Sequence, residues 1–241
     1  MNMCCHNVVQ DNWKQVRFEV EWSISQQCIN KTSRSSIPVS GILYDGIESS
    51  SGILVSALPE HSTVCVRDEW RASEIPTAIV PYDGIPLSSL GFQGQSNVAF
   101  HISPLVKHVN TDAINPTFVS TPFVSISDAN GDITTHSFYI MGVRYEAQKD
   151  SSAESFKFIN WAEYRLKLHS SNGFFTSYIL RAEQDIRVSF WGAPILTATG
   201  KISSIVVHQW NLAEGAVGIV GMKIKSFIGS IPLLSTQLVS I

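Results

Sequence analysis

The segment 16–25, Val-Arg-Phe-Glu-Val-Glu-Trp-Ser-Ile-Ser, alternates strictly between apolar and polar residues. Because successive side chains of a strand point to opposite faces, this pattern places all of the large apolar groups on one face and a charged, hydroxyl-rich row on the other. A helix with its period of 3.6 residues would spread the same apolar groups around its circumference. The segment therefore predicts a half-buried antiparallel strand, and its apolar face, which includes Phe18 and Trp22, needs a second layer to cover it.

Similar short apolar or alternating runs recur along the whole chain, separated by residues that favour turns. The further strands predicted are 39–44, 52–58, 63–67, 97–103, 117–127, 133–143, 163–169, 174–182, 186–191, 202–208 and 217–228. No window keeps a helical period, although short helical turns are expected near 160–163 and 211–215. The pattern predicts an all-β fold, an antiparallel β-sandwich of jelly-roll type with long Pro/Gly-rich loops and little helix.

Three connections are distinctive. The stretch 68–96 contains three prolines and three glycines, so we expect an irregular excursion with one short strand at 78–81. The Asn130-Gly131 pair lies between two apolar runs and predicts a β-hairpin. A polar loop is expected over 148–154.

The length of 241 residues suits a single β domain over 1–241. Within it we expect a flexible N-terminal segment at 1–12 and an apolar C-terminal tail at 229–241 that can pair at a sheet edge. Charged residues make up only 15% of the chain, against roughly 25% in a typical soluble domain. Such a surface suits a protein largely covered by partners, although an ordinary β-rich domain with many Ser and Thr residues fits equally well.

The net charge of −3 and the absence of a block of like charges argue against a free surface that grips nucleic acid electrostatically. The four cysteines, Cys4, Cys5, Cys28 and Cys65, have neither the spacing of a disulfide framework nor that of a zinc site, so we expect free thiols in a reducing compartment. No apolar run reaches the ~20 residues of a membrane span.

Sequence motifs for catalysis are also missing. The chain has no Gly-x-Ser-x-Gly elbow and no Gly-rich phosphate loop before a helix. Its seven histidines are dispersed, and we expect His101 and His169, on the polar faces of their strands, to lie at the surface or an interface. Glu19 and Glu21 share one face of the first strand and are interpreted as a solvated row rather than a catalytic pair. The sequence therefore predicts no catalytic residue, cofactor or metal site, and a chain that is not an enzyme.

Two segments carry a resemblance to a known family. Asn97-Val-Ala-Phe-His-Ile-Ser-Pro104 is a mid-chain strand closed by proline, and Ile186-Arg-Val-Ser-Phe-Trp-Gly-Ala-Pro194 is a late strand that ends in an aromatic-Gly-Pro break. With the low charge and the long Pro/Gly excursions, the chain resembles the jelly-roll coat proteins of icosahedral picorna-like RNA viruses, most nearly the plant-infecting secovirid branch.

The resemblance implies a structural capsid subunit that assembles with itself or with sister coat proteins around single-stranded RNA. It would be found in the virion, and in the host cytoplasm during assembly. The loops 68–96 and 148–154 would lie on the outer surface or at symmetry contacts. RNA contact would be sparse, and the candidate RNA-facing residues are Lys14, Arg17, Lys31 and Arg34.

Two other classes of protein stay open. A plant-virus movement protein with a related β-sandwich core would bind RNA along an exposed basic surface, which the charge balance does not favour. A carbohydrate-binding β-sandwich would expose aromatic side chains in a groove.

Overall fold

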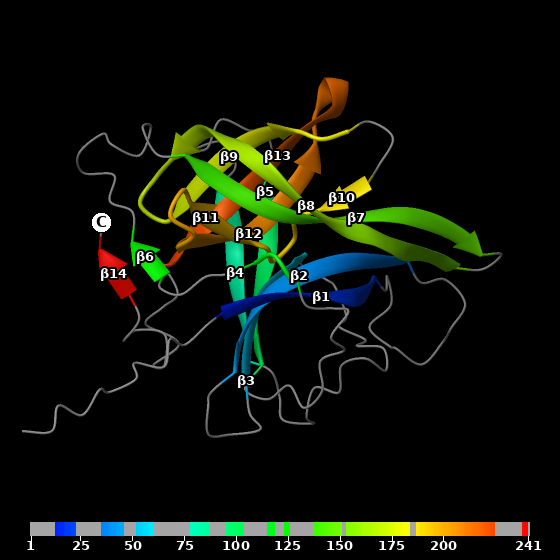
Figure 1. Ribbon diagram of the computed structural model, residues 1–241, viewed down its shortest axis with the longest axis horizontal. Coiled ribbons are helices and arrows are strands. Elements are labelled where there is room, and N and C mark those ends of the chain that lie inside the picture. Colours follow the sequence, from blue (N-terminus) through cyan, green and yellow to red (C-terminus); the bar gives the residue numbers. More distant parts are fainter. Residues whose placement is uncertain are drawn as a thin grey trace, which may run out of the picture.

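The computed structural model in Figure 1 describes residues 13–22, 35–45, 52–59, 78–86, 95–103, 115–118, 123–125, 137–150, 153–183, 187–224 and 238–240. Side chains are described over 13–17, 38–42, 115–118, 137–148, 156–183 and 187–224. The expected strand at 63–67, the N-terminal segment 1–12 and most of the excursion 68–96 lie outside the described residues.

The all-β prediction is confirmed. The strands are β1 (Trp13–Trp22), β2 (Ser35–Asp45), β3 (Gly52–Pro59), β4 (Ala78–Pro86), β5 (Gln95–Ser103), β6 (Phe123–Ser125), β7 (Phe138–Asp150), β8 (Ala153–Ser171), β9 (Phe175–Arg181), β10 (Arg187–Ser189), β11 (Pro194–Thr197), β12 (Ile202–Asn211), β13 (Ala216–Lys223) and β14 (Leu238–Ser240). A 3₁₀ turn, η4 (Ala213–Gly215), lies in the predicted helical turn at 211–215. The helical turn expected at 160–163 is wrong, because these residues lie within β8. Within the described ranges, no helix is long and apolar enough to cross a membrane.

Six strands close into a barrel. Following the antiparallel pairings from β7 through β8, β9, β13, β12 and β11 leads back to β7. The last step pairs Ile195 of β11 with Ile140 of β7. Beyond β11, the same edge of β7 pairs with β10, where Val188 faces Arg144. Closure removes free sheet edges from this part of the molecule.

One apolar cluster fills the barrel, with members from all six strands, β10 and the turn after it. The buried members are Phe138, Ile140, Leu166, Tyr178, Leu180, Val188, Phe190, Ala193, Ile195, Val206, Val217 and Ile219. Gly142 makes room for it, because a Cβ atom there would lie 2.6 Å from Cε1 of Phe190. The ring of Phe190 meets that of Tyr164 edge to face, with centroids 5.2 Å apart.

The remaining long strands form a sheet in the order β1-β2-β3-β5-β4 that joins the barrel through β2. In Figure 1, β1 and β2 (blue) run beneath the β7–β8 hairpin (green). Backbone N–H of Ser40 donates to the carbonyl of Trp191, and the Gln15 amide donates to the carbonyl of Met141. These long-range bonds fix the first two strands against the barrel.

The predicted short strand at 78–81 is wrong in length, since β4 continues to Pro86. Its proline and glycine content is tolerated for two reasons. β4 ends the strand order, so the missing N–H of Pro81 breaks no inner ladder. The pairing with β5 also shifts register between Tyr82 and Ile85, and such a bulge absorbs Gly84.

The hairpin predicted around Asn130-Gly131 is wrong in the described part of the chain. β6 pairs in parallel with β12 and β14, not with β7. Instead, β7 takes β8, β10 and β11 as partners. Long-range pairing that closes the barrel has prevailed over the local turn signal, although the residues of the turn itself, 126–136, lie outside the described residues. The apolar tail contributes β14, which pairs with β6 as an edge-pairing tail would.

The polar loop predicted at 148–154 is also wrong. β7 continues to Asp150 and β8 starts at Ala153, and these two residues are paired. Most of the expected loop is therefore strand, in a long β7–β8 hairpin with one register shift between Arg144 and Tyr145. Its polar residues are compatible with strand because both faces near the hairpin end are exposed over 146–148.

Candidate nucleic-acid interface

β8 carries a row of basic side chains on the outside of the barrel. Its inward residues are apolar, with Leu166 5% exposed and Tyr164 and Leu168 packed against the core cluster. The alternate residues Arg165, Lys167 and His169 are exposed. Arg165 and Lys167 lie on one face about 6.6 Å apart, and His169 follows them at a register shift between Leu168 and Ser170.

β9 adds a fourth basic group. Lys167 pairs with Ile179, so the antiparallel register brings Arg181 toward Arg165. Together the two strands line an open groove of about 440 Å³. Its polar lining is Arg165, Lys167, His169 and Arg181, and its apolar lining is Leu168, Ile179, Leu180 and Ala216. Among the residues that the structure describes, this lining holds no acidic side chain.

Local contacts set the limits of the groove. Nη2 of Arg165 donates a hydrogen bond of 3.3 Å to Oγ of Ser137. This bond uses one of the five N–H donors of the guanidinium. Glu163 is exposed two residues before Arg165 on β8, so the basic row ends there. The arrangement can hold an anion, and its length along the strand suits successive phosphates of a chain better than one compact anion.

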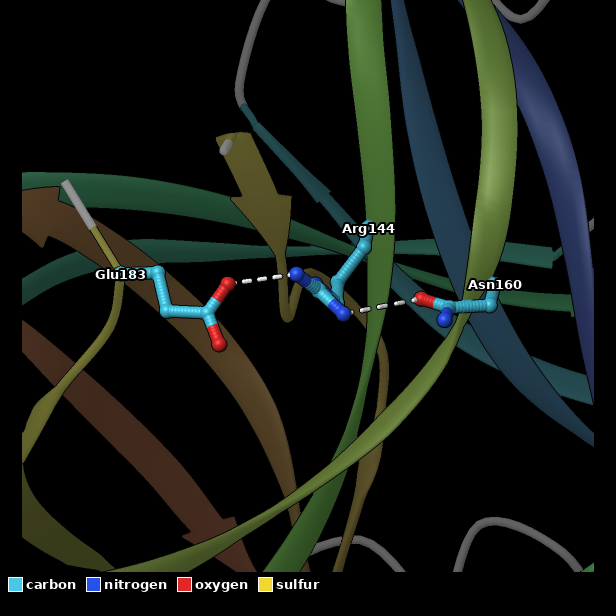
Figure 2. A network of polar contacts seen from close by, with 3 residues as sticks. All are labelled: Arg144, Asn160 and Glu183. Carbon is cyan, nitrogen blue, oxygen red and sulfur yellow. Dashed lines mark hydrogen bonds and ion pairs between the residues drawn. The ribbon is translucent and has the colours of Figure 1, made fainter. Parts of the chain in front are cut away.

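A second hollow, a cleft of about 490 Å³, lies beside the groove, and Ala216 lines both. Its polar lining is Tyr145, Glu183, Arg187, Gln209 and Asn211. Here the charges are mixed. Nη2 of Arg144, beside the cleft, donates to Oε2 of Glu183 at 2.5 Å, and Nη1 donates to Oδ1 of Asn160 at 3.4 Å. Figure 2 shows the guanidinium held between these two groups.

The pair also acts on a neighbouring phenol. The pKa of Tyr164 is raised above its usual value of 10.0, mainly because the side chain is half-buried. The charge of Arg144 lowers this pKa and that of Glu183 raises it. The two charges therefore partly cancel at Tyr164 as they do in the cleft.

Gln209 fixes one wall of the cleft. Its Nε2 donates to the carbonyl of Val188 at 2.8 Å, and its Oε1 accepts from the N–H of Phe190 at 2.7 Å. The side chain thus replaces backbone pairing between β12 and the end of β10. The Gln209 amide is therefore engaged in hydrogen bonds to the backbone of β10 and Phe190.

An aromatic group lies on the other face of β12. The ring of His208 is 5.5 Å from that of Trp191 and 5.1 Å from that of Trp210. Burial lowers the pKa of His208 from 6.5 to about 4, because the charged imidazolium loses its hydration. Trp210 lies directly over Gly218, where a Cβ would be 2.6 Å from the indole.

Of the four residues predicted to face RNA, two lie in the described part. Lys14 and Arg17 are three positions apart on β1 and therefore project from opposite faces. Arg17 packs its guanidinium 4.1 Å from the ring centroid of Phe158. Lys31 and Arg34 lie outside the described residues. The structure thus does not bring Lys14 and Arg17 into one patch, and their contact with RNA stays a prediction.

The groove was missed in the sequence although its signal was present. The alternation in 163–169 predicted the strand and the exposed position of His169, and both are confirmed. The outward residues of the same alternation are all basic from Arg165 to His169. What the sequence could not supply was Arg181, because it depends on the register between β8 and β9.

Comparison with known proteins assigns no family. No family model matches the chain, and no curated protein matches it. Among solved structures it is similar to the apo form of the MamO protease domain from Magnetospirillum magneticum, at 11% identity and a TM-score of 0.33, over 94% of this chain and 98% of that one.

This likeness to a protease domain contradicts the expectation of a chain that is not an enzyme, and we withdraw that expectation. At a TM-score of 0.33 the likeness transfers no activity and no catalytic residue to this chain. Within the described residues, no group of three or more His, Cys, Asp or Glu side chains is placed to hold a metal ion.

Proposed function

We propose that this chain is a structural protein of an RNA virus that contacts single-stranded RNA through the groove of β8 and β9. The observation that supports this is the row Arg165, Lys167 and His169, joined by Arg181, in a groove whose described lining has no acidic group. All four side chains are exposed, so they can reach a polymer that passes over the surface.

The basic groups of the groove can attract RNA even though the whole chain carries a net negative charge. The net charge of −3 acts over the whole surface, where salt screens it beyond roughly 8–10 Å. Within that distance the phosphates would meet mainly the basic groups of the groove. A single strand neutralised by three or four such groups releases counterions, so its affinity falls as salt rises.

In the first form of the proposal the chain is a capsid subunit. It assembles with copies of itself or with sister subunits around single-stranded RNA, in the virion and in the host cytoplasm during assembly. The jelly-roll arrangement predicted from the sequence belongs to this form and stays a proposal, because the six barrel strands close on themselves and are not one layer of a sandwich. The low charged fraction of 15%, which suits a surface covered by neighbours, supports it.

The second form is a movement protein, and the groove specifically favours it. Such a protein is expected to bind RNA along an exposed basic surface, which the overall charge argued against and the groove supplies. A carbohydrate-binding module gains less support, because within the described residues the groove lining has no Phe, Tyr or Trp side chain and the cleft lining has one, Tyr145.

Particle size separates the two forms. The purified full chain, with and without single-stranded RNA, is examined by negative-stain microscopy and sedimentation velocity. Closed megadalton shells are the result expected for a capsid subunit. Small soluble species that retard RNA in a salt-sensitive gel shift support the movement protein. Small species without RNA affinity would overturn both forms.

A further inference from the structure

The β8–β9 hairpin ends in a rigid tip that presents an aromatic side chain. Phe174 lies at the end of the turn and its side chain is 57% exposed, the most exposed of the large apolar residues described. The next, Ile159, is 37% exposed. Single exposed apolar residues are common, so the inference depends on how the tip is held and on its position.

Asn172 organises the tip. Its Oδ1 accepts hydrogen bonds from the backbone N–H of Phe174 at 2.9 Å and of Phe175 at 2.8 Å. Its own N–H donates to the carbonyl of Phe175 at 2.9 Å. An asparagine that caps two successive N–H groups fixes a turn locally.

A buried lysine anchors the same turn to β13. Lys223 is 3% exposed, and its Nζ donates to the carbonyl of Asn172 at 2.6 Å. The N–H of Lys223 donates to the carbonyl of Phe174 at 2.8 Å. Burying an ammonium group is costly unless it is hydrogen-bonded. The bond from Lys223 to Asn172 therefore stabilises the position of the tip against β13.

The tip continues the basic row. His169, which lines the groove, precedes Asn172 by three residues at the hairpin end of β8. A strand of RNA lying over Arg165, Lys167 and His169 therefore reaches Phe174 next. Proteins that bind single strands combine a basic track with aromatic side chains on which bases stack.

We propose that Phe174 stacks on an unpaired base of the RNA strand whose phosphates lie in the β8–β9 groove. The inference rests on the proposed RNA binding and specifies it: the ligand is single-stranded. Phe174 stacks on the face of a base without distinguishing one base from another. The fixed turn keeps the ring in position before binding, so less conformational entropy is lost on contact.

The test compares the full chain with Phe174→Ala, and uses Ile159→Ala as the matched control, because Ile159 is an exposed apolar residue of β8 outside the groove lining. The probes are an oligouridylate of about 12 nucleotides and an abasic strand of the same length. We expect Phe174→Ala to weaken oligouridylate binding roughly five- to tenfold, with little change for the abasic strand. Phe174→Trp retains a stacking surface and should bind at least as well as the wild type.

The outcomes separate this inference from the proposed function. If the wild type binds neither strand, RNA binding itself fails. If the wild type binds but Phe174→Ala matches Ile159→Ala on both probes, the groove stands and stacking is wrong. Equal losses on the abasic and base-containing strands would also overturn stacking. A variant that loses self-association with unchanged oligonucleotide affinity would place Phe174 against a second copy of the chain instead.

Discussion

The groove on β8 and β9 and the cleft beside β10 are of similar size, about 440 and 490 Å³, but they differ in how their charges are balanced. In the cleft, Glu183 is already paired with Arg144. The described lining of the groove contains four basic groups and no acidic residue. Two hollows of similar volume can therefore differ in the net charge that they present to a ligand.

Reversing charges in each hollow should separate their contributions to RNA affinity. We expect the double variant Lys167→Glu and Arg181→Glu to lose RNA affinity by about 4 kcal/mol, roughly a thousandfold, because each reversal replaces about 1 kcal/mol of attraction at 4 Å in water by the same repulsion. The matched control is Arg187→Glu, an exposed arginine of the cleft. Filter binding with a labelled oligonucleotide measures both, and an equal loss in the control would remove the distinction.

The stability of the fold should depend on pH through His208 on β12. Burial holds the pKa of His208 at about 4, against 6.5 when unfolded, so the unfolded chain binds the extra proton first. The free energy of unfolding should therefore fall as the pH drops from about 6.5 to 4, by about 3 kcal/mol in total. Urea unfolding at several pH values measures this, and a His208→Gln variant with the same acid slope as the wild type would contradict it.

Packing beside the cleft can be disturbed without touching the groove. In Gly142→Ala the new Cβ would lie 2.5 Å from Cγ2 of Val188 and 2.6 Å from Cε1 of Phe190, so we expect a loss of about 1–3 kcal/mol in unfolding free energy. Gly173→Ala is the control, since no heavy atom lies within 4 Å of its added Cβ. Thermal melts compare the two, and the RNA affinity of Gly142→Ala well below its melting temperature should stay at the wild-type value. A melting temperature of Gly142→Ala equal to that of the control would show that the barrel interior can accommodate the added methyl group.

The smallest expected effect tests charge compensation in the cleft. The carboxylate of Glu183 is 68% exposed, so Glu183→Gln should change the unfolding free energy by less than about 1 kcal/mol. It should, however, lower the pKa of Tyr164, because the Glu183 charge raises it, whereas Arg144→Met should raise the pKa further. NMR titration of labelled tyrosine measures the shifts. A Tyr164 pKa that moves the same way in both variants would be inconsistent with this pairing.

Local sequence patterns predicted where strands occur better than they predicted which strands pair. The alternation in 163–169 is visible in the sequence, and the strand that it predicts occurs in the structure. The pairing of β6 with β12 and β14 is not, because those segments lie far away in the chain and a strong Asn-Gly signal favoured a local hairpin. Prolines in 68–96 likewise concealed the part of β4 after Pro81, which an edge position and a bulge make possible.

The candidate site was predictable to the extent that it lies on one strand. The row from Arg165 to His169 follows from parity alone, whereas Arg181 and the anchoring of the tip by Lys223 depend on register and on contacts across the barrel. Net charge did not reveal the groove for a physical reason: it averages over the molecule, while screening makes the local potential depend on the charges within roughly one Debye length.

The salt dependence of RNA binding shows whether the basic groups of the groove contact the phosphates. If three or four groove groups each neutralise a phosphate of a single strand, the logarithm of the association constant should fall against the logarithm of salt concentration with a slope of about −2 to −3. The Lys167→Glu and Arg181→Glu variant should flatten that slope, and Arg187→Glu should leave it unchanged. An RNA affinity that does not vary with salt, or a wild-type slope retained in the groove variant, would contradict the account.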